Sequence, residues 1–262
     1  MEFLSILLSS LIFIGSPVGF VLDQVAENAI RARVSAVDDL AVRVDNGSNV
    51  NLLQGKIDRL QVAARGLYPV PGLRIAIADL ETDPVDLNIQ RLRRGQVVLD
   101  RPLSGVLHLA IDQADLNAYL SSPQFAQRLN QLQISLGNAV QSREISRYEV
   151  TNPRVKFLAD GRLQLELTLA ETALGEGLDI VLQTGIAVER GHRLALADIQ
   201  VTANDRAVPE QLIEAATATL GEQLSLRRLE SSGLTARVLN FSLAEEQLSV
   251  TLWASVDPRV AP

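Results

Sequence analysis

The sequence predicts an α+β fold in which curved antiparallel β-sheet outweighs helix, and three observations support this class. Apolar and polar residues alternate in short runs along most of the chain, whereas helical spacing of three and four is confined to a few segments. Strict alternation buries one face of a strand and leaves the other wet, which favours antiparallel over parallel sheet. The third observation is a run without charge, residues 3–22, that precedes the alternating body.

Composition narrows the classes of function. Of the 262 residues, 47% are hydrophobic but only 4% are aromatic, so Leu, Val, Ile and Ala must supply most of the apolar surface. The net charge of −7 argues against nucleic acid as a partner, because its phosphates would repel such a surface. The absence of cysteine excludes thiol catalysis, disulfides and cysteine-ligated metal.

The N-terminal segment has three interpretations. Residues 3–14 are apolar enough to begin a membrane span, but Gly15-Ser-Pro17 interrupts the run. A secretory signal would need a basic start, and this chain has Glu2 instead. Residues 1–16 therefore form an anchor or interfacial helix, a signal-like segment, or a helix packed on the protein's own core. We expect residues 17–256 to form a single domain and residues 257–262 to form a tail.

Helical spacing recurs in three places. It predicts an amphipathic helix over residues 18–37, lying against the sheet, with Pro17 at its start. Asp112 can cap a second helix that contains Leu116 and Leu120. A third helix is expected to open at residues 204–205, with Pro209 in its first turn.

The alternating runs predict hairpins. Residues 41–44 are followed by Asn46-Gly47, a dipeptide that suits a type I′ turn, and residues 50–54 are the expected partner strand. The clearest hairpin joins residues 155–159 to 163–169 through Asp160-Gly161. Further strands are predicted over residues 57–65, 73–78, 84–91, 96–100, 106–111 and 194–201.

No catalytic or metal-binding pattern was found in the sequence. Nucleophile-elbow, Walker A and dinucleotide-binding glycine motifs are all missing. His108 and His192 are the only histidines, and neither has a second ligand at metal-binding spacing. We therefore expect a protein that is not an enzyme and that needs no cofactor or metal.

Two features could touch lipid. Arg91, Arg93 and Arg94 place three guanidinium groups within four positions of an otherwise acidic chain, and guanidinium suits phosphate contact. The alternative for these arginines is a charged hairpin rim. The apolar loop over residues 67–72 carries Tyr68, an interfacial side chain, but most such loops fold back on their own domain.

Two stretches carry a family resemblance: Val42-Arg-Val-Asp-Asn-Gly47, and the residues from Leu52 through Gly66. Through them the chain resembles the LmeA-like phospholipid-binding family, and the resemblance continues through residues 106–117 and 185–191. The resemblance implies a tubular lipid-binding (TULIP-like) fold, in which a strongly curved antiparallel sheet wraps on a few long amphipathic helices. It also implies phospholipid binding at the cell envelope, and it supplies no catalytic residues.

The resulting prediction is an elongated apolar groove between helices and sheet that holds phospholipid acyl chains at a membrane surface, with possible transfer of lipid. The predicted lining residues are Val21, Leu22, Val25, Leu116, Leu120, Leu165 and Leu167. Arg91, Arg93 and Arg94 are the predicted headgroup contacts. Alternation does not say which strand face points inward. The competing interpretations are a membrane-anchored structural or interaction protein without ligand, and an unrecognised enzyme of envelope lipid or glycolipid metabolism.

Overall fold

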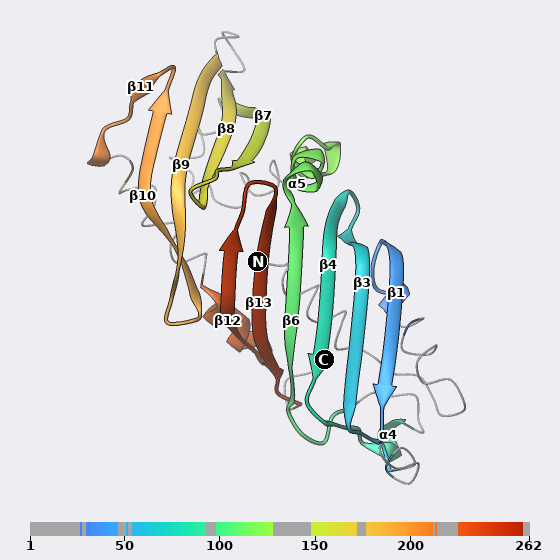
Figure 1. Cartoon of the computed structure of the whole chain (residues 1–262). Coiled ribbons are helices and arrows are strands. Elements are labelled where there is room, and N and C mark those ends of the chain that lie inside the picture. Colours follow the sequence, from blue (N-terminus) through green and yellow to red (C-terminus); the bar gives the residue numbers. More distant parts are fainter. Residues whose placement is uncertain are drawn as a thin grey trace.

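The computed structural model describes residues 27, 30–46, 51, 54–92, 98–127, 148–171, 177–211, 213 and 225–258. Within them, 63% of residues lie in strands and 17% in helices, all of them short. The predicted α+β class, with a sheet wrapped on a few long helices, is therefore wrong, and the protein is mostly antiparallel β-sheet (Figure 1). Helical spacing lasts only two turns before Ser121-Ser-Pro123 interrupts it, whereas alternation continues for ten or more residues in most strands.

A six-stranded antiparallel sheet occupies one half of the molecule. Its spatial order is β1-β3-β4-β6-β13-β12, so the C-terminal hairpin completes a sheet that the N-terminal strands begin. The strands are β1 (Ala36–Asp45), β3 (Arg59–Val70), β4 (Leu73–Thr82), β6 (Leu103–Asp112), β12 (Leu234–Leu243) and β13 (Gln247–Val256).

A five-stranded antiparallel sheet forms the other half, in the order β11-β10-β9-β8-β7 (Figure 1). Its strands are β7 (Tyr148–Phe157), β8 (Arg162–Glu171), β9 (Gly177–Glu189), β10 (Arg193–Ala203) and β11 (Arg206–Ala207). A small two-stranded sheet pairs β2 (Lys56–Ile57) with β5 (Val85–Asp86).

Short helices connect these strands. They are α4 (Ile89–Leu92), α5 (Gln113–Leu120) and the 3₁₀-helix η1 (Leu226–Ser232). The helix predicted to reach Val37 ends at Arg31, because the Ser35 amide already donates to the Tyr68 carbonyl and β1 begins at Ala36. The earlier part of that predicted helix, like residues 1–16, lies outside the described residues. None of the helices in the described ranges has the length and hydropathy that a membrane crossing requires.

The main core lies on one face of the six-stranded sheet. It contains Leu107 and Ile75, both fully buried, and residues from every strand of that sheet. Ile30, just before β1, and Leu226 and Leu229 of η1 belong to the same cluster. At the centre of the sheet the two faces therefore differ sharply, with an apolar inner face and a polar outer one.

Of the hairpins and strands predicted from the sequence, one hairpin is confirmed, another is wrong, and one strand is interrupted. The hairpin of β7 and β8 around Asp160-Gly161 is confirmed, with Val155 opposite Leu165 and Phe157 opposite Leu163. The hairpin through Asn46-Gly47 is wrong, because β1 pairs with β3 rather than with residues 50–54. Pairing with the longer β3 buries Leu40 against the core, which a local turn could not achieve. The predicted strand over residues 84–91 is interrupted after β5 by α4.

The apolar loop over residues 67–72 folds back on its own domain. Val70 and Leu73 are buried in a small cluster with Tyr119 of α5, and Phe125 packs against it. The rings of Tyr119 and Phe125 meet edge to face with their centroids 5.6 Å apart. This packing fixes α5 on the end of the β3–β4 hairpin.

Candidate functional site: the apolar face of the five-stranded sheet

The register of the five-stranded sheet gathers its apolar side chains on one face. Side chains alternate along a strand, and directly opposed residues share a face. Leu165 of β8 lies opposite both Val155 of β7 and Leu182 of β9, and Leu182 lies opposite Val201 of β10. The surface defined in this way, here the apolar face, comprises Val150, Val155, Phe157, Leu163, Leu165, Leu167, Leu169, Leu178, Ile180, Leu182, Thr184, Ile186, Val188, Leu194, Leu196, Val201 and Ala203.

The only hydroxyl of this set is turned into the backbone. Thr184 is buried to 1% exposure, and its Oγ1 donates to the carbonyls of Gly185 and Ala197 at 2.9 and 3.0 Å. Ala197 is where the pairing of β9 and β10 shifts register. The hydroxyl therefore satisfies the irregular backbone and adds no polar group to the face.

The apolar face is only partly covered. Val155 and Phe157 are buried, but Leu163, Leu165, Leu167 and Leu169 are half-buried, and Leu178 is 36% exposed. The comparable face of the six-stranded sheet is a closed core. A row of apolar side chains that stays partly accessible is a candidate site for an apolar ligand or partner.

The face is long and narrow. The ten residue steps from Leu178 to Val188 on β9 correspond to about 33 Å of strand. At the end of the face next to the β9–β10 turn, Val188 and Leu194 pack against the main core, so the apolar face and the core of the six-stranded sheet are continuous there. The opposite end, at Leu178, is the more exposed one.

The opposite face of the same sheet is polar and internally bonded. Lys156 Nζ donates to Glu166 Oε1 at 2.6 Å, and Gln164 Nε2 donates to the same oxygen. The hydrogen bond from Lys156 lowers the pKa of the Glu166 carboxyl below its ordinary value. Thr168 continues this polar row by donating to Asp179 Oδ1 at 2.8 Å. The contrast between the two faces fixes the strand register, because a shift of one residue would move the apolar side chains of a strand to the polar face. The apolar face is therefore the one that can take up apolar material.

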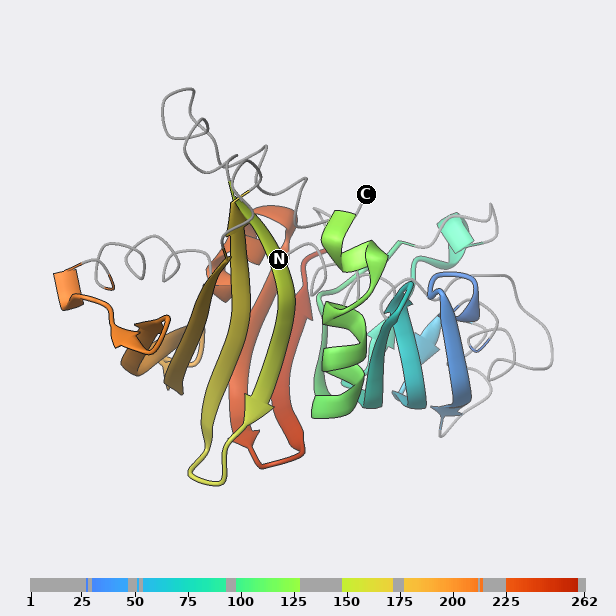
Figure 2. The ribbon, with the colours of Figure 1, turned by 90° about the horizontal axis from the view of Figure 1, so that it is seen from above.

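Helix α5 holds the edge of this sheet against the other half of the molecule. The Val155 amide donates to Asn117 Oδ1 and Asn117 Nδ2 donates to the Val155 carbonyl, both at 2.8 Å. The Phe157 amide donates to Gln113 Oε1. Two side-chain amides thus replace a neighbouring strand along β7, and Figures 1 and 2 show α5 between β7 and the strands β6 and β4.

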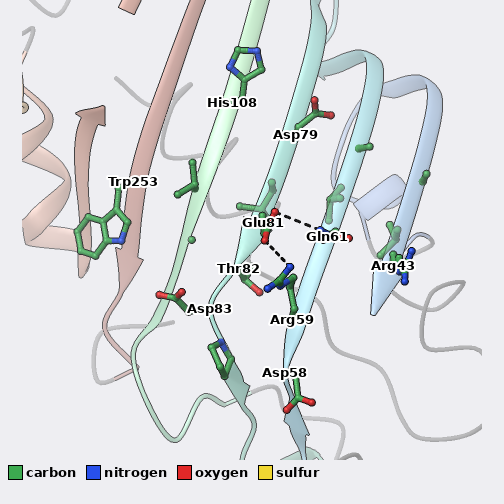
Figure 3. Close-up of a pocket in the computed structure, with 18 of the residues that line it drawn as sticks. Arg43, Asp58, Arg59, Gln61, Asp79, Glu81, Thr82, Asp83, His108 and Trp253 are labelled. Atoms are coloured by element: carbon green, nitrogen blue, oxygen red, sulfur yellow. Dashed lines mark hydrogen bonds and ion pairs between the residues drawn. The ribbon is translucent and has the colours of Figure 1, made fainter. Parts of the chain in front are cut away.

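A concave surface lies on the outer face of the six-stranded sheet. This open hollow has a volume of about 850 Å³ and is lined by residues of β1, β3, β4, β6 and β13. We call it the polar hollow. Figure 3 shows Arg59 and Gln61 both directed at Glu81, with His108 and Trp253 on the neighbouring strands. The Arg59–Glu81 pair is 3.1 Å apart, and His108 Nδ1 lies 3.2 Å from Thr251 Oγ1.

Two ion pairs, Arg59–Glu81 and Arg65–Asp79, occupy the centre of the polar hollow. Arg65 and Asp79 form a bidentate pair, and this hydrogen bond raises the pKa of the Arg65 guanidinium above its ordinary value. His108 meets a hydroxyl rather than a carboxylate. Across the described ranges, no group of three histidines and carboxylates could hold a metal ion. The hollow is therefore a polar surface whose central charges are paired, and the apolar face is the stronger candidate for a site that binds apolar ligands.

The structure brings together only part of the predicted site. Leu165 and Leu167 lie on the apolar face, and Leu116 and Leu120 lie half-buried on α5, which contacts β7. Arg91 is on α4, which Figure 1 places at the far end of the molecule from β8. Val21, Leu22, Val25, Arg93 and Arg94 lie outside the described residues, and the prediction of a groove between helices and sheet rests partly on them.

Sequence reasoning missed most of the apolar face. The contributions of β9 and β10, from Leu178 to Ala203, were not among the predicted lining residues. Their alternation was the available signal, because Ile180, Leu182 and Ile186 recur at every second or fourth position. Thr184 interrupts the pattern at its centre, because it replaces an apolar residue at an even position.

Comparison with known proteins gives one match. The model of a family described as LmeA-like phospholipid-binding matches residues 15–252, nearly the whole chain. No curated protein and no solved structure matches the chain.

Proposed function

Because the chain belongs to the LmeA-like phospholipid-binding family, we propose that its apolar face holds the acyl chains of a phospholipid at a membrane. The single observation that carries this placement is the half-buried row of aliphatic side chains along β7 to β10. The proposed role is non-enzymatic, and it includes carrying lipid between the membrane and another acceptor. We place this activity at the cell envelope.

The dimensions and chemistry of the face support the proposal. A bilayer leaflet is about 15 Å of hydrocarbon thick, half of the usual core, so a face of about 33 Å is long enough for an acyl chain. Each methylene that leaves water contributes about 0.8 kcal/mol. Because the side chains of the face are aliphatic except for Phe157 and the buried Thr184, they can line a smooth surface for such a chain.

The chemistry of the apolar face and of the polar hollow supports a binding role rather than catalysis. Within the described part of the chain, the apolar face contains no ionisable side chain, and the ionisable groups of the polar hollow are largely engaged with one another. General acid–base catalysis needs a titratable group poised beside the substrate.

Residues 3–14, which are uncharged and mostly apolar, support a position at a membrane, because such a segment can begin a membrane span or lie in the bilayer interface. Removing residues 1–16 is expected to release much of the protein from membranes without unfolding the sheets. Fractionation and circular dichroism measure the two effects. Unchanged membrane partition would contradict this role of the segment.

The acyl-chain site is tested by changing one face of β8 and β9. Leu165→Gln combined with Leu182→Gln places two amides at the centre of the apolar face, where they lie directly opposite each other. We expect the phospholipid that co-purifies with the protein to fall severalfold, because an acyl chain cannot satisfy the buried amides. Lipid extraction followed by mass spectrometry measures the bound phospholipid per protein.

The matched control lies one residue away. Val181→Gln introduces the same amide next to Leu182 on the polar face, also at a half-buried position, and is expected to leave lipid content unchanged. Circular dichroism and thermal melting establish that each variant is folded, and the single Leu182→Gln replaces the double variant if that one unfolds. A parent protein without phospholipid, or equal lipid in all folded variants, would refute the proposal.

A further inference from the structure

Arginine residues from two distant stretches of the sequence meet at one corner of the molecule. The β9–β10 turn supplies Arg190 and Arg193, η1 supplies Arg227 and Arg228, and β12 supplies Arg237. We call the set of residues 189–193, 225–230 and Arg237 the basic corner. Its five arginines and two glutamates leave a formal charge of +3 on a protein whose total is −7.

Backbone hydrogen bonds hold these segments together. The Leu226 amide donates to the His192 carbonyl at 2.7 Å, and the Val238 amide donates to the Gly191 carbonyl at 2.6 Å. Arg193 also bridges to Ser225 across the same junction. The clustering is therefore a property of the fold, and a hollow of about 490 Å³ lies beside Glu189, Arg190, His192 and Arg193.

The corner carries more positive charge than its own ion pairs use. Glu230 pairs with Arg237 at 3.1 Å, and Glu189 pairs loosely with Arg193 at 3.7 Å. Arg190, Arg227 and Arg228 are exposed, and their side chains make no ion pair or hydrogen bond with the described part of the chain. Three guanidinium groups are thus available to an anion.

The conformation of Arg190 is a second observation that points to a ligand. Arg190 and Gly191 occupy the central positions of the turn, with φ of +50° and +68°. A type I′ turn of this kind prefers Asn, Asp or Gly at both positions, and a long side chain there is strained. Strain of this sort is typical of positions where function selects the side chain. Here it places a guanidinium at the tip of a hairpin.

We propose that the basic corner docks the protein on the phosphate groups of an anionic bilayer surface. This inference rests on the proposed function, because docking would bring the apolar face to the source of its lipid. The ends of that face differ in charge. Val188 and Leu194, at one end, adjoin the basic corner, whereas Asp179, Asp205 and Arg206, with a formal charge of −1, lie near the other. An anionic surface therefore attracts the first end more strongly, since a negative leaflet binds basic clusters and repels carboxylates.

The test compares vesicle binding by full-length variants. Arg190→Asn with Arg227→Gln removes two free guanidinium groups, and asparagine suits the positive φ, so the turn keeps its shape. Arg154→Gln with Arg206→Gln is the charge-matched control, because both arginines are exposed on the five-stranded sheet away from the corner. Sedimentation with phosphatidylglycerol vesicles and with phosphatidylcholine vesicles gives two affinities for each variant.

We expect the parent and the control to prefer the anionic vesicles, and the corner variant to lose about fivefold in that affinity per guanidinium removed. Binding to phosphatidylcholine vesicles, and co-purified lipid, should be the same in all three proteins. Equal loss in the control and corner variants, or a parent without preference for anionic vesicles, would overturn the inference. Lipid content reports separately on the apolar face, so the proposed function can stand while this inference fails.

Discussion

The amide of Asn117 should be one of the most important single side chains for the stability of this fold. Its two hydrogen bonds to Val155, both 2.8 Å, join α5 to the exposed edge of β7. Val155 is only 6% exposed, so water has little access to its backbone once the amide is removed. Asn117→Ala loses two hydrogen bonds and leaves a donor and an acceptor unpaired, which together cost about 2–4 kcal/mol.

Urea unfolding, monitored in two ways, measures this cost. Trp253 is the only tryptophan and lies on β13, so its fluorescence reports on the six-stranded sheet, whereas far-ultraviolet circular dichroism reports on both sheets. We expect the free energy of unfolding to fall by the stated amount. The transition seen by circular dichroism should also begin at lower urea than that seen by fluorescence, because the five-stranded sheet loses its attachment.

Two further variants isolate the reason for the effect. Gln124→Ala removes an exposed amide that has no hydrogen bond within the described ranges, and it should change stability by less than about 0.5 kcal/mol. Asn117→Asp keeps an acceptor for the Val155 amide but turns a carboxylate toward the Val155 carbonyl at neutral pH. Its deficit should shrink in acid, where the protonated carboxyl can donate. Equal stability of Asn117→Ala and Gln124→Ala would refute the reasoning.

Three other outcomes follow from individual contacts. Lys156→Met should flatten the acid side of the stability profile. The hydrogen bond from Lys156 lowers the pKa of the Glu166 carboxyl, so this bond stabilises the folded parent fully at pH values above the ordinary carboxyl pKa, and the stabilisation is lost as the pH falls through the lowered pKa. Identical urea midpoints from pH 3 to 6 in both proteins would contradict this. Thr184→Val should cost about 1 kcal/mol in urea unfolding despite its similar size, because the carbonyls of Gly185 and Ala197 lose their donor, and no loss relative to Thr202→Val would count against it. Arg65→Ala should change stability by less than about 1 kcal/mol, since Arg65 and Asp79 are 47% and 39% exposed; a larger loss would show that the pair has a structural role.

Alternation made the strands predictable, but it could not predict which strands pair. The β7–β8 hairpin was foreseen because its turn, its period and its length all agree locally. The Asn46-Gly47 turn carried an equally strong local signal, yet β1 pairs with β3 instead. Burial of Leu40 against a complete sheet outweighs a favourable dipeptide, and that gain depends on residues far along the chain.

The candidate site shows the same limit. Leu165 and Leu167 could be named in advance because a single strand displays the period, whereas their neighbours on β9 and β10 became part of one face only through the register. The arginines of the basic corner come from two stretches, residues 190–193 and 227–237, that are more than 30 positions apart, so no single window of sequence reveals the whole cluster. Conversely, the cluster of arginines that is visible in the sequence includes Arg91, which lies on α4, remote from the apolar face.

The two sheets have the same alternating pattern but different degrees of coverage, and this difference argues for a ligand rather than a purely structural role. On the six-stranded sheet, Leu226, Leu229 and Ile30 cover the apolar face and bury its side chains. On the five-stranded sheet, the contact that the structure describes for α5 is with the β7 edge, and the leucines of β8 remain half-buried. Leaving such a row accessible to water costs about 25 cal/mol per Å² of apolar area relative to burying it. A protein that gained nothing from the exposure would lose stability by keeping it, whereas a protein that exchanges acyl chains needs an apolar surface that its own chain does not fully occupy.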